Sequence, residues 1–286
     1  MLASPAPPWQ DDLMPLITRF APSPTGHLHL GHAFAAWAVA AWAQHLRASM
    51  LLRLEDIDQT RCRPEFEESI LADLKWLGLN YEGPILRQSQ RMHLYAHAID
   101  RLKDLNLIYP CSCTRAQVLA TSQHTGPDGP LYSKTCWKHG PTPGQPVAWR
   151  LNMNAALSRA GNLRLDPRPW GDLILVRRQM PTSYHISVVV DDADQGVSHV
   201  MRGTDLQGIT AVHQLLQTLL GLPIPAYAYH SLLTHSDGRK FSKSERAPTL
   251  RDLRTQGFSP HDLKFRLNSI PNLRGQIDAI KAGNLL

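Results

Sequence analysis

Residues 16–32 read LITRFAPSPTGHLHLGH, and this stretch decides the fold class. Its first five residues are predicted to form a short buried strand. Residues 21–26 are predicted to form a loop, because this segment is rich in Pro and Gly. Residues 32–46 hold strong helix formers and neither Pro nor Gly, which predicts a helix. A strand followed by a loop and a helix is typical of an α/β fold.

The same order of elements continues along the chain. A second strand is predicted at residues 49–54, and amphipathic helices at residues 63–77 and 91–105, where apolar side chains share one helix face. The β-branched run at residues 186–190 is typical of a buried parallel strand. The last predicted elements are a helix at residues 206–219, a strand at residues 226–233 and two short helices after residue 249.

Residues 110–146 differ from the segments on either side. They hold three of the four cysteines, many Gly and Pro residues, and little periodicity. We interpret them as part of an inserted subdomain that includes strands at residues 148–153 and 173–178. The predicted fold is a Rossmann-type α/β catalytic domain with a parallel sheet, an inserted small zinc-containing subdomain and a short helical C-terminal tail. The expected division is a disordered lead-in at residues 1–15, catalytic halves at 16–108 and 184–248, the insertion at 109–183 and the tail at 249–286.

The composition bounds the class of protein. The 286 residues carry a formal net charge of +6, with a pI near 9.3, which suits a polyanionic partner such as nucleic acid or a nucleotide. The apolar fraction of 43% is that of an ordinary globular protein. No apolar run reaches membrane-spanning length, and the Pro-rich N-terminus lacks the pattern of a signal peptide. We expect a cytoplasmic protein with no membrane partner, and we expect a monomer.

Three histidines, His27, His29 and His32, lie at the start of the first predicted helix. A helix N-terminus presents unpaired N–H groups and partial positive charge to an anion. Gly31 has no side chain, so adenine or a phosphate can approach the backbone closely, while His29 and His32 donate hydrogen bonds to phosphate oxygens. The pattern predicts a phosphate site. Metal ligation, or histidines that merely line a polar loop, are the alternatives.

Residues 240–244 read KFSKS. Lys240 and Lys243, beside the hydroxyl of Ser242, predict a cationic loop that closes over a triphosphate and neutralises charge in the transition state. A solvated surface turn is the alternative for such a segment taken alone.

Together, HLGH at residues 29–32 and KFSKS resemble the two signatures of class I aminoacyl-tRNA synthetases. The resemblance implies ATP-dependent activation of an amino acid, with Mg²⁺ accompanying ATP. It implies catalytic roles for His29, His32 and Lys243. The implied ATP-binding residues are these three together with Pro22, Gly31, Lys240 and Ser242.

Three further segments, RFAPSPTG at residues 19–26, LRLEDID at 52–58 and DLKWLGL at 73–79, resemble glutamyl-tRNA synthetases. Glutamate brings two carboxylates and one ammonium. Arg19 offers a bidentate fork to a carboxylate, and Glu55 can pair with the ammonium. Both lie at the ends of predicted strands, where open parallel sheets bind their ligands. The resemblance implies a glutamate site made of Arg19, Phe20, Ala21, Pro22, Ser23, Glu55, Tyr184 and Arg202.

The acidic segment at residues 55–58 has a second interpretation. Glu55, Asp56 and Asp58 could hold magnesium, because carboxylate oxygens are ligands that this ion prefers. We keep this as the lesser alternative.

The cysteines of the insertion indicate a metal. Cys111 and Cys113 cannot easily close on each other as a disulfide, but two thiolates can share an ion, and Cys136 supplies a third sulfur. Zn²⁺ takes four ligands in a closed structural site. Candidates for the fourth are Tyr132, His124 and His139, of which the histidines are chemically easier. Three cysteines that hold no metal are the alternative.

The Cys-Ser-Cys and Tyr-x-x-x-Cys patterns resemble the zinc site of glutamyl-Q tRNA(Asp) synthetases, which are truncated paralogues of glutamyl-tRNA synthetases. This resemblance implies one structural Zn²⁺ held by Cys111, Cys113, Tyr132 and Cys136. We expect a truncated member, because only residues 245–286 follow KFSKS, which is too little for a large anticodon-binding domain.

The resemblance implies activation of L-glutamate with ATP, and transfer to the queuosine base in the anticodon of tRNA(Asp). A basic surface on the insertion and tail would hold the anticodon stem-loop through phosphate contacts. One alternative is a compact glutamyl-tRNA synthetase that charges a tRNA 3′ end or another acceptor. A second is a non-catalytic, zinc-containing RNA-binding paralogue.

Overall fold

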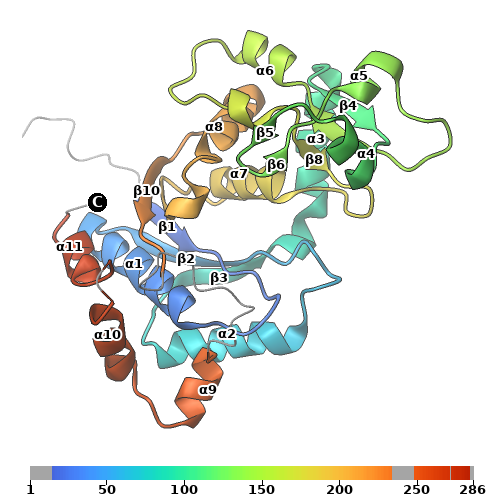
Figure 1. Ribbon diagram of the computed structural model, residues 1–286. Helices are drawn as coiled ribbons and strands as arrows, with labels where there is room; N and C mark the ends of the chain where they lie inside the picture. The colour runs from blue at the N-terminus through green and yellow to red at the C-terminus, as the bar shows by residue number, and fades with distance from the viewer. Residues whose placement is uncertain (1–14, 234–247, 271, 284–286) are drawn as a thin grey trace, which may run out of the picture.

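The computed structural model describes residues 15–233, 248–270 and 272–283. Figure 1 shows a central group of strands, with an upper lobe of green and yellow-green segments on one side and a helical tail, coloured orange to red, on the other. Among the helices described, none combines the length and the apolar character that crossing a membrane would require.

Five strands make up the centre: β1 (Ile17–Phe20), β2 (Ser49–Leu54), β3 (Glu82–Arg87), β9 (His199–Gly203) and β10 (Ala226–His230). β1 pairs with β2, β2 with β3, and β9 with β10, all in parallel. The Ser198 N–H donates to the Ile17 carbonyl at 3.0 Å, which brings β9 beside β1. The resulting order, β3-β2-β1-β9-β10, is a doubly wound arrangement, so the predicted α/β fold with a parallel sheet is confirmed.

Helices cover both faces of these strands (Figure 1). On one side lie α1 (Leu30–Leu46) and α2 (Pro64–Trp76), and on the other lie α3 (Met92–Asp104), α7 (Tyr184–Asp194) and α8 (Thr210–Leu220). α1 begins two residues before the predicted start at residue 32, because His29 caps the helix through its side chain. Most of α1 is buried, including Trp37 and Trp42, which explains its nearly continuous apolar sequence.

The strand predicted at residues 186–190 is wrong, because these residues belong to helix α7. Ile186, Val188 and Val189 are buried, and α7 packs against both α3 and α8. A helix buried on several sides loses the polar stripe that marks an amphipathic helix, so its sequence resembles a buried strand. The strand of this region is β9, which lies further along the chain and was not predicted, and neither was β3.

The upper lobe contains an antiparallel sheet of β4 (Ile108–Cys111), β7 (Ala148–Leu151) and β8 (Ile174–Val176), in the order β4-β7-β8. β7 and β8 match the two strands predicted for the insertion. The lobe also contains α4 (Arg115–Thr121), β5 (Thr125–Gly126), β6 (Gly129–Pro130), α5 (Thr135–His139), α6 (Met153–Ala160) and the 3-10 helix η2 (Arg168–Trp170).

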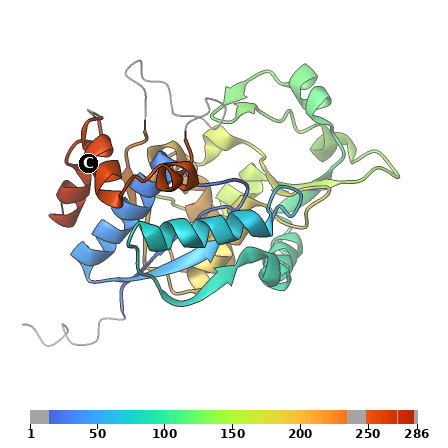
Figure 2. The same cartoon turned by 90° about the horizontal axis from the view of Figure 1, so that it is seen from below.

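The described part of the tail, residues 249–270 and 272–283, holds three helices, where two were predicted: α9 (Leu250–Thr255), α10 (Pro260–Asn268) and α11 (Gln276–Lys281). α9 packs on α2, while α10 and α11 pack on α1. Seen from below, the tail lies beside the blue helix α1, away from the green lobe (Figure 2). The tail therefore covers the face of α1 that the sheet leaves open.

Asp191 ties α7 to α3. Its buried carboxylate accepts hydrogen bonds from Gln88 Nε2 at 2.7 Å, Tyr95 OH at 2.8 Å and Arg91 Nε at 2.8 Å.

Asp191→Ala should lower the free energy of unfolding by about 3–5 kcal/mol, because it leaves buried polar partners unpaired. Urea unfolding measures this loss. Asp100→Ala, at a carboxylate of α3 that is 62% exposed, should change stability by no more than about 0.5 kcal/mol, and equal effects would contradict the assignment.

Candidate active site

A cavity of about 400 Å³ opens at the carboxyl ends of β1, β2 and β9. Seven of the residues predicted to bind glutamate line it: Arg19, Phe20, Ala21, Ser23, Glu55, Tyr184 and Arg202. Pro22 does not line it, although its carbonyl accepts the Glu55 N–H at 3.0 Å and so fixes the loop that Glu55 begins. The structure thus brings the predicted set together, and the binding role of each residue stays a prediction.

The sequence did not indicate several other residues that line the cavity: Ala35, Val39, Met201, Gly203, Leu206 and His230. His230 ends β10 and Gly203 ends β9. Their position at the carboxyl ends of parallel strands was the available signal. This signal could not be used for Gly203, because the strand that it ends, β9, was not predicted.

A buried network of one carboxylate and two guanidinium groups holds Arg19, which lines the cavity. Asp192 Oδ1 accepts from Arg19 Nε at 2.9 Å and from Arg53 Nη1 at 2.7 Å, and these side chains are 3%, 5% and 0% exposed. Burial alone would raise the pKa of Asp192, but the two guanidinium groups outweigh it and lower the pKa. Asp192 is therefore ionised at neutral pH and holds Arg19 in place at the cavity wall.

Glu55 adds a carboxylate to the same cavity. Its Oε1 lies 3.4 Å from Arg53 Nη2. Burial raises the pKa of Glu55, while Arg53 and Arg19 act in the opposite direction. A buried carboxylate facing a cavity can pair with a ligand ammonium, which would favour its charged form.

Arg202 lies across the cavity in a network of buried polar groups. Its Nη2 donates to Thr210 Oγ1 at 2.7 Å, and its Nη1 lies 3.0 Å from His213 Nδ1. Its Nε is buried without a hydrogen-bond partner among the described residues. A buried N–H with no partner costs free energy, which a ligand oxygen would recover.

The Arg202 bond determines the tautomer of two histidines. A guanidinium only donates, so His213 Nδ1 must accept and the ring carries its proton on Nε2. His213 Nε2 lies 3.3 Å from His185 Nδ1. Since His213 Nε2 donates, His185 Nδ1 must accept, and the His185 ring carries its own proton on Nε2. Burial and the neighbouring Arg202 charge lower the pKa of His213, in agreement with a neutral ring.

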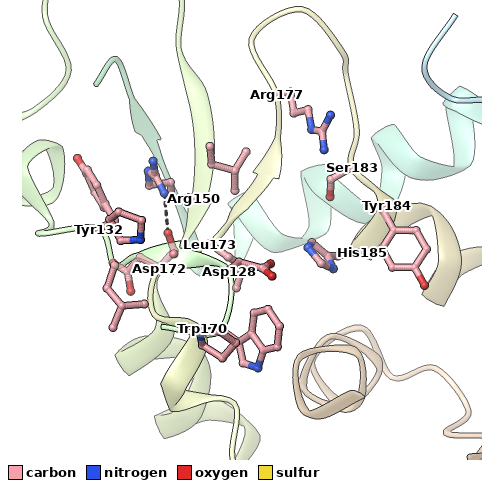
Figure 3. A pocket seen from close by; sticks show the side chains of 15 residues that line it. Asp128, Tyr132, Arg150, Trp170, Asp172, Leu173, Arg177, Ser183, Tyr184 and His185 are labelled. Atoms are coloured by element: carbon pink, nitrogen blue, oxygen red, sulfur yellow. Dashed lines mark hydrogen bonds between the residues drawn. The ribbon is translucent and has the colours of Figure 1, made fainter. Parts of the chain in front are cut away.

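His185 and Tyr184 also line a second cavity, of about 340 Å³, between α7 and the upper lobe (Figure 3). Burial, with the charges of Arg177 and Arg202, lowers the pKa of His185 to about 4. Burial and the charge of Glu55 raise the pKa of Tyr184 to about 12, so its hydroxyl stays protonated. Tyr184 therefore forms a neutral wall that the two cavities share.

The HLGH segment forms a capping box at the start of α1. His29 Nδ1 accepts from the Gly31 N–H, and His32 Nδ1 accepts from the His29 N–H, both at 3.1 Å. Each neutral ring thus carries its proton on Nε2, which a phosphate oxygen can accept. A Cβ on Gly31 would lie 3.0 Å from the His29 ring, so glycine lets this ring fold over the helix start. The sequence prediction left the N–H groups of the helix start unpaired for an anion, whereas the His29 ring accepts one of them, that of Gly31.

Lys240, Ser242 and Lys243 lie outside the described residues. The described residues that flank this segment lie at HLGH: Thr249 forms an antiparallel bridge with His29, and the Leu250 N–H donates to the Leu28 carbonyl at 2.7 Å. Leu233, on the other side, lies 3.9 Å from the position of a Cβ on Gly31. The described residues on both sides of this segment, Leu233 before it and Thr249 after it, therefore lie beside the start of α1.

Cys111, Cys113 and Cys136 come together in the upper lobe, with all three sulfurs within 4.8 Å of one another. Tyr132 OH lies 3.3 Å from Cys111 Sγ and 3.4 Å from Cys113 Sγ, and accepts the Cys136 N–H at 2.7 Å. Burial would raise the pKa of Cys136, but hydrogen bonds from Tyr132 and Cys113 lower it to about 6. Three sulfurs and one oxygen converging on a point fit a four-coordinate zinc.

Neither His124 nor His139 joins this cluster in the part of the chain that the structure describes. Asp56 and Asp58, the alternative magnesium ligands, have other partners. Asp56 accepts from Ser89, through both its N–H and its hydroxyl, and Asp58 pairs with Arg61 at 2.6 Å. These bonds shape the loop after β2 and give no support to a separate magnesium site there.

Residues 15–266 match the family described as tRNA synthetases class I (E and Q), catalytic domain. The chain is 44% identical to a glutamyl-Q tRNA(Asp) synthetase of Rhodobacter capsulatus over 87% of this chain and 98% of that protein. It is 42% identical to the protein of that name from Thiobacillus denitrificans, over 82% of this chain and 79% of the relative.

A crystal structure of a glutamate-tRNA synthetase from Elizabethkingia anophelis superimposes with a TM-score of 0.64 at 24% identity, a likeness of fold alone. It covers 86% of this chain, which spans about half, 54%, of that structure.

We expect His185→Gln to weaken the dependence of stability on pH. The unfolded chain takes up this proton near pH 6.5, and the folded protein only near pH 4. The neutral ring thus contributes stability that is complete above pH 6.5 and is lost as the pH falls toward 4. Removing it should reduce that loss by about 1–3 kcal/mol.

Urea unfolding at several pH values between 4 and 7 measures this change. His93→Gln, at an exposed histidine of α3, is the matched control and should keep the slope of the unsubstituted protein. A His185→Gln variant with that same slope would show that His185 titrates normally.

Proposed function

Because the chain belongs to the family of class I tRNA synthetases for glutamate and glutamine, we propose that it activates L-glutamate with ATP and transfers it to the queuosine base in the anticodon of tRNA(Asp). The observation that carries the activation step is the cavity where Arg19, Glu55 and Arg202 converge. The acceptor is proposed from the names of the relatives, one of which is matched over 98% of its length. We further propose a monomeric enzyme of the cytoplasm.

The charges of the cavity fit glutamate. Arg19 and Arg202 lie on its wall as donors for two carboxylates, and the buried Nε of Arg202 has no hydrogen-bond partner among the described residues. Glu55 would pair with the ammonium. Phe20, Ala21, Ser23 and Tyr184 complete the wall around the aliphatic part.

In the first step, the α-carboxylate oxygen of glutamate attacks the α-phosphorus of ATP in line, and the bond to pyrophosphate breaks. The protein supplies no nucleophile, so its role is to position the reactants and stabilise charge. The Nε2–H groups of His29 and His32 would donate to phosphate oxygens, and Lys243 would neutralise the leaving pyrophosphate, with Lys240 and Ser242 beside it. Mg²⁺ bound with ATP would neutralise further phosphate charge.

We propose that one structural Zn²⁺ is held by Cys111, Cys113, Tyr132 and Cys136. The hydrogen bond from the Cys136 N–H to the Tyr132 oxygen supports this set, because it would stabilise a phenolate. The site would tie β4 to α5, and thereby fix the lobe that faces the RNA.

Aminoacylation with labelled glutamate tests the proposal. We expect label on tRNA(Asp) that contains queuosine and none on tRNA(Asp) without it, and we expect ribonuclease digestion to place the label in the anticodon fragment. Label at the 3′ end of tRNA(Glu) would support a compact glutamyl-tRNA synthetase instead. No ATP–pyrophosphate exchange with any amino acid would support a non-catalytic RNA-binding protein.

Lys243→Ala should slow glutamate-dependent ATP–pyrophosphate exchange by about 100-fold or more, because the charge on the transferred phosphates would lose its cation. Lys103→Ala, at a surface residue of α3 paired with Asp100, is the matched control and should keep the normal rate. Exchange at the control rate in Lys243→Ala would remove this lysine from the mechanism.

Purified protein should contain about one zinc per chain by atomic emission, and Cys136→Ser should lose it, since it removes one of the four ligands. Cys62→Ser is the matched control, because Cys62 does not belong to the cluster. Zinc retained by the Cys136 variant, or absent from the unsubstituted protein after purification with added zinc, would contradict the site.

A further inference from the structure

The second cavity, of about 340 Å³, is separated from the proposed glutamate site by one side chain, Tyr184. Loop residues 127–131, the Trp170–Ile174 segment and the start of α7 enclose it. Its volume is that of a small-ligand site, about 300–1,000 Å³ in most proteins. A group bound there would lie next to an amino acid activated on the other side of Tyr184.

The polar groups of this cavity are of mixed type. Ser183 is 3% exposed, and its buried Oγ has no hydrogen-bond partner among the described residues. His185 presents a neutral ring with its proton on Nε2, as the bonds to His213 and Arg202 require. Asp128 contributes a carboxylate, which when ionised accepts hydrogen bonds and donates none. A ligand that both donates and accepts, as a hydroxyl group does, satisfies all three.

The two ends of the cavity differ. In Figure 3, Trp170 lies at one end and the exposed Arg177 at the other, with Asp128 and His185 between them. An indole face is a platform for a flat base, and an exposed guanidinium is a partner for a backbone phosphate. The order from one end to the other is thus aromatic, hydroxyl-binding and phosphate-binding.

We propose that this cavity is the acceptor subsite, which takes one nucleoside of the RNA, turned out of its stack, whose base carries hydroxyl groups. The base stacks on Trp170, its hydroxyls bond Asp128, Ser183 and His185, and the adjoining phosphate pairs with Arg177. This subsite rests on the proposed function. It adds the residues that read the acceptor, which the glutamate cavity does not contain.

The histidine tautomers constrain the transfer step. Because the Tyr184 side chain lies between the two cavities, transfer requires it to turn aside. The acceptor hydroxyl oxygen then attacks the carbonyl carbon of the glutamyl-adenylate, the bond from that carbon to the phosphate oxygen breaks, and AMP leaves. His185 cannot take the hydroxyl proton, because Nδ1 already accepts from His213 and Nε2 is protonated. The proton passes to the departing phosphate, and His185 acts as a donor that orients the acceptor.

The experiment compares two rates for each variant: glutamate-dependent ATP–pyrophosphate exchange, and transfer of labelled glutamate to queuosine-containing tRNA(Asp). Asp128→Asn and Trp170→Ala should each lower the ratio of transfer to exchange by about tenfold or more, because hydroxyl recognition or stacking is lost. Trp170→Phe keeps an aromatic face and should stay within about threefold of the normal ratio. Asp166→Asn, at an exposed carboxylate paired with Arg168, is the matched control.

A normal ratio in both Asp128→Asn and Trp170→Ala would overturn the acceptor subsite, whatever the exchange rate. An equal loss in the ratio of transfer to exchange in Asp166→Asn would overturn it as well, because removal of any nearby negative charge would then have the same effect. Absence of exchange in the unsubstituted protein is a different result, which refutes the proposed function itself and removes the premise of the subsite. A folded Trp170→Phe variant that loses transfer as completely as Trp170→Ala would exclude stacking on this residue.

Discussion

The buried charge of Asp192 is the constraint on which the rest of this structure depends. A carboxylate that is 3% exposed persists only if it is paired, and it is paired with Arg19 of β1 and Arg53 of β2. Asp192 belongs to α7, so the ion pair joins the second half of the chain to the first. It thereby fixes where α7 begins, and with it Tyr184, relative to the carboxyl ends of the strands.

A second constraint is the absence of positive charge on the histidines around Arg202. His213 and His185 lie in line from Arg202 toward the second cavity, and either ring as a cation would repel the guanidinium in a poorly solvated space. Burial is the larger cause that lowers both pKa values, and the charge of Arg202 lowers them further. The chain of bonds fixes the tautomers, so the structure assigns donor and acceptor atoms that the residue names alone leave undecided.

Local signals predicted the elements that have a plain signature. The Pro-Gly loop and the helix formers after it place β1 and α1, and α1 differs from the prediction only at its first turn, where two histidine side chains cap the helix. The failure at residues 186–190 has a different cause. α7 is buried against α3 and α8, so it lacks the polar stripe by which an amphipathic helix is recognised, and the β-branched run gives a strand signal instead.

The sequence by itself determined the fold class, the two segments that resemble a class I synthetase and the spacing of the cysteines, because each depends on residues close together in the chain. Only the tertiary structure decided that Arg19, Glu55 and Arg202 share one cavity, that Tyr132 rather than a histidine joins the three sulfurs, and that a second cavity lies behind Tyr184. These depend on contacts between residues far apart in the chain, such as the hydrogen bond from the Ile17 N–H to Ser198 Oγ, which joins residues 181 positions apart. Such contacts arise from the packing of strands and helices and leave no local pattern in the chain.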